Sequence, residues 1–248
     1  MRTSLFLAPL LLASLAATGC SKKETVASSD IATHGMALDV IAKGNGSNTY
    51  VFVAVHVGDW NSNSFASLDK GDTLVLHVPG GADRPLQINS SNGKTWYETT
   101  VDGVTAGEFV VDLVRTSAAS AKGNRIALPP PFNITAPTGT VSRKNPFTVT
   151  WDAPSSGYDM NVALDGDCIS HVEKTADGAR SSFTFNTGDV EALGGASGTH
   201  AKDVCPVTLT VTRRIFKQES GGNFSSEFGH QSQRDAQQLR VATFQSGE

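Results

Sequence analysis

The residues whose side chains do chemistry are scattered along the chain, and no catalytic spacing joins them. G-x-S-x-G, H-E-x-x-H and strand-linked G-x-G-x-x-G motifs are missing from the sequence, so we expect a protein that is not an enzyme and needs no cofactor. The alternative is a hydrolase whose site is assembled from loops, with His200, Asp203 and a serine of residues 194–199.

Metal-ligating residue types are present, but their spacing places no complete set of ligands. His56 and His77 fall in strand-like runs without a third ligand, which favours solvent-facing side chains over a metal site. Asp59, Asp69 and Asp72 offer oxygen ligands for calcium, yet turn capping accounts for each of them singly. We therefore expect no bound metal.

Aromatic residues outside clear core positions are the remaining chemical signal. Trp60 stands in a loop-like run, and Trp96 and Tyr97 are adjacent, so on a strand their rings point to opposite faces and one of them is a candidate for exposure. Rings displayed on strands or loops bind sugars or proteins. Trp60, Trp96 and Tyr97 are therefore our candidate ligand-binding residues.

Composition describes a folded chain without an affinity for nucleic acid. The 248 residues are 39% hydrophobic, which is enough apolar material for a core. Lys and Arg number 20 against 24 Asp and Glu, and no basic cluster occurs that could hold a phosphate backbone. Nucleic acid is therefore excluded as an expected partner.

The N-terminus has the three regions of a secretory signal: Arg2, an apolar run over residues 5–15, and small residues before Cys20. The segment Ala17-Thr18-Gly19-Cys20 resembles the lipobox of bacterial lipoproteins. That resemblance implies cleavage before Cys20 and acylation of Cys20, with the acyl chains holding the protein on a membrane. In that family Ser21 favours the outer membrane. An ordinary signal peptide with a chance cysteine is the alternative.

Two cysteines remain once Cys20 is assigned to lipid. An even pair in an exported chain predicts a disulfide between Cys168 and Cys205, because the compartment is oxidising. A zinc site is disfavoured, since neither cysteine belongs to a C-x-x-C motif or has paired histidines nearby.

Strand-like runs with turn residues between them fill the rest of the chain. In residues 73–78 the apolar side chains Leu74, Leu76 and Val78 alternate with polar neighbours, as a half-buried strand requires. The prolines at positions 129–131 interrupt the pattern, because they cannot donate to a ladder. We predict an all-β chain of two tandem immunoglobulin-like β-sandwich domains. The predicted divisions are a signal peptide at 1–20, a flexible tether at 21–33, and domains at 34–129 and 130–248.

The start of the second predicted domain is similar to a fibronectin type III domain over residues 132–164. The likeness rests on Phe132–Pro137, on Pro146–Pro154 with Trp151, and on Tyr158–Val162. It implies that Trp151 packs in the core of an immunoglobulin-like sandwich. Beyond it, residues 217–238 are polar and contain glycine, and the sequence fits either a long hairpin or a mobile loop.

These features together predict a lipid-anchored envelope protein that binds or scaffolds without catalysis. Its expected partner beyond the membrane is an envelope protein. The alternative partner is a glycan or cell-wall polymer, bound through Trp60, Trp96 and Tyr97.

Overall fold

Strands make up nearly all of the regular structure in this protein, as the sequence predicts. The computed structural model describes residues 24–195, 197–215 and 223–248. Eleven strands form one large sheet: β1 (Glu24–Ala27), β2 (Met36–Gly44), β3 (Asn48–Val57), β4 (Ser64–Ser67), β7 (Gln87–Ser91), β8 (Lys94–Asp102), β12 (Thr140–Ser142), β14 (Asp159–Gly166), β15 (Val172–Asp177), β17 (Cys205–Arg214) and β18 (Gln233–Gly247).

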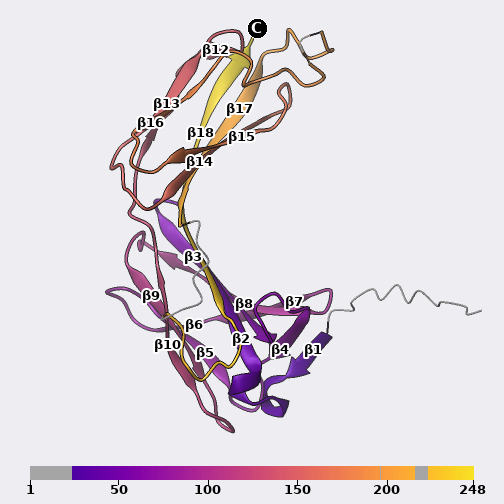
Figure 1. Ribbon diagram of the computed structural model, residues 1–248, viewed down its shortest axis with the longest axis vertical. Helices are drawn as coiled ribbons and strands as arrows, with labels where there is room; N and C mark the ends of the chain where they lie inside the picture. The colour runs from indigo at the N-terminus through magenta and orange to yellow at the C-terminus, as the bar shows by residue number, and fades with distance from the viewer. Residues whose placement is uncertain (1–23, 196, 216–222) are drawn as a thin grey trace, which may run out of the picture.

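Two smaller sheets complete the fold. The second sheet contains β5 (Thr73–His77), β6 (Arg84–Pro85), β9 (Glu108–Val114) and β10 (Ala121–Ala127). The third contains β11 (Ile134–Thr135), β13 (Phe147–Trp151) and β16 (Ser182–Phe185). Figure 1 shows an elongated, bent molecule with the large sheet along the inner side of the bend and the two small sheets on the outer side.

Two hydrophobic cores fill the space between the large sheet and each small sheet. Apolar residues of β2, β3 and β8 meet those of β5, β9 and β10 in the first core. The second core joins β14 and β17 to β13 and β16, and Trp151 is buried in it, as expected. Leu128 belongs to the first core and Phe132 to the second, so the proline run at 129–131 lies between them.

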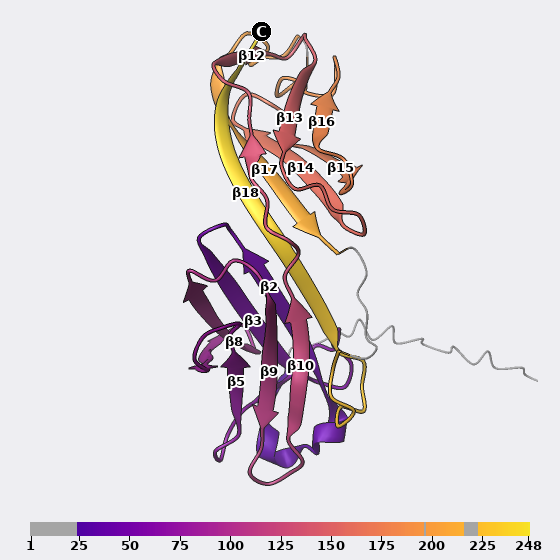
Figure 2. The same cartoon turned by 90° about the vertical axis from the view of Figure 1, so that its left-hand side faces the viewer.

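The last strand, β18, belongs to both halves of the molecule. Its first part pairs in parallel with β2, from Gln233 opposite Asp39 to Gln238 opposite Gly44. Its second part pairs antiparallel with β17, and Figure 2 shows it running along the length of the molecule. Ala236 packs in the first core and Phe244 in the second.

The return of the chain to the first core differs from the predicted division, which placed all of residues 130–248 in the second domain. Phe228 and Ala236 are buried in the first core, with Phe224 packed against it. The sequence pattern missed this because the first part of β18 is almost entirely polar, with Ala236 as its only apolar residue. Of the predicted hairpin or loop at 217–238, residues 217–222 lie outside the described residues, and residues 233–238 are strand.

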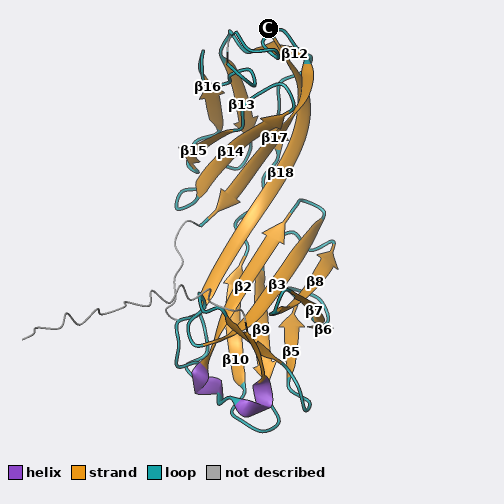
Figure 3. Ribbon diagram, turned by 90° about the vertical axis from the view of Figure 1, so that its right-hand side faces the viewer, coloured by secondary structure: helices purple, strands orange, loops and turns teal. Residues whose placement is uncertain are grey.

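Residues 24–33 form regular structure where the composition predicted a flexible tether. β1 pairs in parallel with β4, and 3-10 turns follow at Ser28–Asp30 and Thr33–Gly35; Figure 3 shows them at the end of the molecule distant from the C-terminus. The physical reason is a buried polar network. Ser28 donates its hydroxyl hydrogen to Asp72, and Arg115 donates to the carbonyl oxygens of Ser28 and Ile31. Polar residues therefore hold this segment in place.

Candidate functional site

The two adjacent aromatic residues of β8 lie on opposite faces of the large sheet. Tyr97 is 4% exposed and packs in the first core, where its hydroxyl oxygen accepts a hydrogen bond from the backbone N–H of Leu68 (2.7 Å). Trp96 is half-buried on the other face. Strand alternation predicted this separation, and it leaves Trp96 as the ring of the pair that is open to a ligand.

Trp96 belongs to an aromatic and polar cluster on the outer face of β3, β7 and β8, which we call the Trp96 face (Tyr50, Phe52, Asn89, Trp96 and Glu98). The rings of Trp96 and Phe52 stack with centroids 6.5 Å apart. The indole N–H of Trp96 donates to Glu98 (2.8 Å), which also accepts from Asn89 (2.8 Å) and from the hydroxyl of Tyr50. Three donors therefore fix one carboxylate beside two rings.

The electrostatics of the Trp96 face follow from this convergence. Partial burial, together with the hydrogen bond to Glu98 and its charge, raises the pKa of Tyr50 to about 12. Tyr50 therefore stays a neutral donor at physiological pH. A flat aromatic pair beside a carboxylate held in position suits a ligand with both apolar and hydroxyl-bearing faces.

Trp60 occupies a separate position in the loop between β3 and β4. Its backbone N–H donates to the carbonyl oxygen of Gln231 (3.0 Å), and the N–H of Gln231 donates to Asp59 (2.9 Å). In the described part of the chain, no ring contact joins Trp60 to Trp96 or Tyr97. Among the described residues, the structure thus brings no two of the three predicted rings into contact. Phe52 and Glu98 were missed because only the pairing of β3 with β8 brings Phe52 beside Trp96.

The predicted disulfide is present. Cys168 and Cys205 are joined with Cα atoms 5.9 Å apart, so the start of β17 is tied to the turn after β14. Arg143 lies beside the bond, with Nη1 3.5 Å from Cys168 Sγ. Both cysteines are buried in the second core, which is the environment of a structural disulfide.

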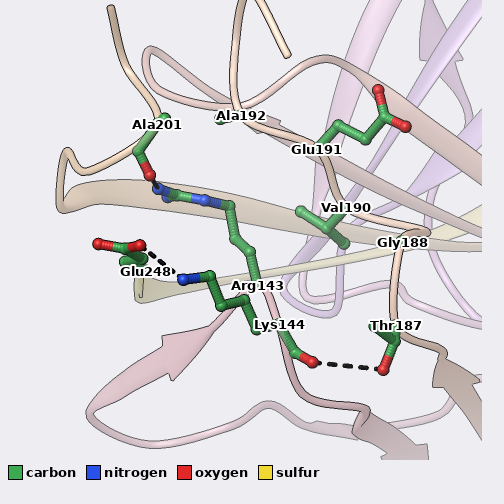
Figure 4. A pocket seen from close by; sticks show the side chains of 9 residues that line it. All are labelled: Arg143, Lys144, Thr187, Gly188, Val190, Glu191, Ala192, Ala201 and Glu248. Atoms are coloured by element: carbon green, nitrogen blue, oxygen red, sulfur yellow. Dashed lines mark hydrogen bonds and ion pairs between the residues drawn. The ribbon is translucent and has the colours of Figure 1, made fainter. Parts of the chain in front are cut away.

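Arg143, which contacts this disulfide, also lines a pocket of about 360 Å³ (Figure 4). Arg143 reaches across it and donates to the carbonyl oxygens of Ala201 (2.8 Å) and Asp203 (3.1 Å). Lys144 pairs with Glu248 at 2.5 Å. These contacts give both cationic groups internal partners, and Arg143 holds the loop at 197–203. Glu191 adds an exposed carboxylate to the lining.

His200 and Asp203, the pair considered for a hydrolase, do meet. Nδ1 of His200 lies 2.8 Å from a carboxylate oxygen of Asp203. Ser197, the serine of this loop, makes no hydrogen bond to His200 within the described ranges. The structure thus brings together two of the residues considered, His200 and Asp203.

His56 and His77 lie in different sheets, on β3 and β5, and not together on one outer face. His56 is buried against Phe65, and burial lowers its pKa. His77 lies between Asp112 (3.1 Å) and Asp83 (2.7 Å), and hydrogen bonds to these two carboxylates raise its pKa. Among the residues that the structure describes, no three His, Cys, Asp or Glu side chains are grouped closely enough to hold a metal ion.

Cys20 and the signal segment lie outside the described residues. In residues 24–195, 197–215 and 223–248, no helix has the length and apolar character needed to cross a bilayer. No protein-family model matches the chain, and a comparison with curated proteins finds no similar sequence. Any statement of function is therefore built from the residues themselves.

Proposed function

We propose that this chain is a lipid-anchored protein of a bacterial envelope that binds or scaffolds without catalysis. The anchor rests on the resemblance of Ala17–Cys20 to a lipobox, with acyl chains on Cys20 as the membrane contact and the outer membrane as the favoured site. The protein then carries two tandem immunoglobulin-like sandwiches.

The pairing of β18 with both halves of the molecule is the observation that carries the scaffolding role. Tandem domains joined by a linker move relative to one another by default. Here the six register pairs from Gln233 to Gln238 make β18 a strand of the same sheet as β2, while its other end is held by β17. A swing between the halves requires breaking that ladder, so the chain acts as one stiff body.

The ordered segment at 24–33 fixes how near this body stands to its anchor. From Cys20 to Glu24, where β1 begins, the chain spans at most about 14 Å when fully extended. The first core is therefore held close to the membrane surface. β18 carries the second core at a fixed position relative to the first, which suits a protein that presents a binding surface.

The test of the anchor is membrane fractionation with metabolic palmitate labelling of the wild type and Cys20→Ser. We expect label and membrane association in the wild type and loss of both in the variant. Membrane association unchanged by Cys20→Ser, without label in the wild type, contradicts the anchor. The binding role is tested by in-cell crosslinking and mass spectrometry, in which a reproducible partner that depends on Cys20 is the expected result.

A second candidate function, glycan binding, is favoured by the Trp96 face. Stacked rings beside a fixed carboxylate form the type of surface on which a sugar lays its apolar face while its hydroxyls donate to oxygen. Trp96→Ala is expected to abolish retention on immobilised cell-wall polysaccharide. Trp60→Ala is the matched control, because Trp60 lies outside this face, and equal retention of both variants contradicts the candidate.

A further inference from the structure

We propose that the free edge of β16 binds an extended segment of a partner protein by strand addition. This inference names the partner chemistry of the binding role proposed above and rests on that role. β16 is a four-residue strand, Ser-Phe-Thr-Phe, and it ends the third sheet with β13 as its one neighbour in the described chain.

The hydrogen-bond pattern between β13 and β16 shows which backbone groups are free. Antiparallel pairs alternate between residues that exchange two hydrogen bonds and residues that exchange none. The N–H of Trp151 donates to the carbonyl oxygen of Ser181 (2.8 Å), so these two residues form a hydrogen-bonded pair. Because the pairs alternate along the register, Phe183 and Phe185 are also hydrogen-bonded to β13, and Ser182 and Thr184 are not. It follows that the N–H and C=O groups of Ser182 and Thr184 point away from β13, toward the open edge.

This edge lacks the features that blunt several other end strands. Natural sheets blunt their edges with charges, prolines or bulges, because an open edge pairs with any extended chain. β10 carries two charged residues and a bulge, β15 carries three charged residues, and β6 contains a proline. β16 carries no charge, no proline and no bulge, and its aromatic and β-branched residues favour pairing. The end strands β7, β11 and β12 also carry no charge and no proline, and β16 differs from them in its two phenylalanines.

A groove of about 540 Å³ runs beside this edge, lined by residues 179–184 and Asn186. Phe183 forms part of its wall: the ring packs edge-on against Phe185 at 5.0 Å but remains partly exposed, and no strand of the described residues pairs beyond β16. Arg180 lies exposed in the same lining. The groove therefore offers backbone pairing, an apolar contact and a positive charge together.

These three features specify the occupant. Alternating N–H and C=O groups are satisfied along their length by another extended backbone, which a sugar or a lipid does not supply. The partner segment places an apolar side chain against Phe183 and an acidic one near Arg180. We therefore commit to an extended, alternating polypeptide from another protein, and a second copy of this chain is the competing occupant that the test must detect.

The test uses residues 20–248 with Cys20→Ser, so that no lipid is attached, and acetyl-Asp-Val-Thr-Val-Thr-Val-amide as the probe. NMR and hydrogen exchange follow the amides of Ser182 and Thr184 during titration. Thr184→Pro removes an outward N–H while sparing the ladder to β13, since position 184 exchanges no bond with it. Thr184→Val is the matched control, because both variants lose the hydroxyl contact with Thr148 but Thr184→Val keeps the N–H.

We expect the probe to slow exchange of the two amides, to bind Thr184→Val normally, and to bind Thr184→Pro about tenfold more weakly, as loss of one backbone hydrogen bond predicts. Equal binding to both variants overturns the proposal. If Thr184→Pro fails to fold, unchanged exchange of Ser182 and Thr184 in the parent chain at saturating probe overturns it instead.

Light scattering without the probe decides between the two occupants. A monomer at all concentrations supports a heterologous partner, whereas a dimer that Thr184→Pro disrupts overturns it in favour of a second copy. Since this experiment involves no lipid, its failure leaves the membrane anchor untouched, and failure of the Cys20→Ser fractionation leaves strand addition untouched.

Discussion

Arg115 Nε lies 3.0 Å from Asp72 Oδ2, and the two side chains are 0% and 1% exposed. This ion pair is the centre of the network that holds residues 24–33 on the first core, since Ser28 contacts both partners. Burial alone raises the pKa of Asp72, but hydrogen bonds from Thr116, Ser28 and Arg115 outweigh it and lower the pKa. Asp72 therefore stays ionised in the folded protein.

Replacing Asp72 by Asn leaves a buried guanidinium without its counter-charge, and such losses cost about 3 to 5 kcal/mol. We expect Asp72→Asn to reduce the free energy of unfolding by about that amount and to release residues 24–33 to fast amide exchange. Urea denaturation and hydrogen exchange measure the two effects. The exposed Asp102→Asn is the control, and equal stability of the two variants refutes the role given to the pair.

The carboxyl group of Asp39 predicts a dependence of stability on pH, opposite in sign to the one that the lowered pKa of Asp72 implies. Burial and the charge of Asp235 raise its pKa from 3.8 to about 6, with Gln233 opposing as a hydrogen-bond donor. Because the pKa of Asp39 is higher in the folded than in the unfolded protein, ionising Asp39 destabilises the fold. The protonated carboxyl group therefore contributes its full stability below about pH 4, and this contribution is lost as the pH rises through 6.

Asp39→Asn removes that dependence. The variant is expected to exceed the wild type in free energy of unfolding by about 3 kcal/mol at pH 8 and to match it below pH 4. Urea titrations at a series of pH values provide the measurement. Asp235→Asn, which removes the repulsion and leaves Asp39 buried, should give a smaller gain. A difference between wild type and Asp39→Asn that does not change with pH contradicts the argument.

Gly44 and Gln238 test whether the junction between β2 and β18 makes the molecule stiff. A Cβ at Gly44 would lie 2.7 Å from Gln238 Oε1, and Gln238 is fully buried with its amide donating to Thr105 (2.6 Å). Gly44→Ala therefore displaces Gln238, at a cost of about 2 kcal/mol. Calorimetry is expected to show the two halves unfolding at temperatures further apart than in the wild type.

The double variant Gly44→Ala/Gln238→Ala supplies the control, because shortening Gln238 makes room for the new methyl group. We expect the double variant to lose less stability than the sum of the single losses, with a coupling of about 1 kcal/mol. Strictly additive losses would mean that the two residues do not meet in solution.

The sequence predicts those parts of the fold that follow from a local pattern of residues, and it does not predict those that depend on distant pairings. Strands such as β17, with Val207, Leu209 and Val211 buried and threonines between them, follow from alternation alone. The disulfide follows from counting cysteines in an exported chain. The positions of residues 24–30 and 233–238 do not follow from the sequence pattern. Buried hydrogen bonds and strand pairing, and not apolar contacts, hold these residues. The Trp96 face does not follow from the pattern either, since Phe52 and Trp96 meet only through the pairing of distant strands.

Loss of the disulfide is expected to affect the stability of the two cores differently, and tryptophan fluorescence can report on each core separately. Cys168–Cys205 closes a separation of 37 residues, and the chain-entropy model gives it about 3 to 4 kcal/mol. Reduction or paired Cys→Ser replacement should therefore destabilise the second core first. Trp151 is buried there, whereas Trp60 and Trp96 belong to the first half of the chain.

Fluorescence of Trp60→Phe/Trp96→Phe, in which Trp151 alone emits, should report an unfolding transition at lower urea after reduction. Trp151→Phe, which leaves the other two rings, should report a smaller shift, transmitted through β18. If both reporters shift equally, the two halves unfold as one unit and the ladder at Gln233–Gln238 is strong enough to spread the loss of the disulfide through the whole protein.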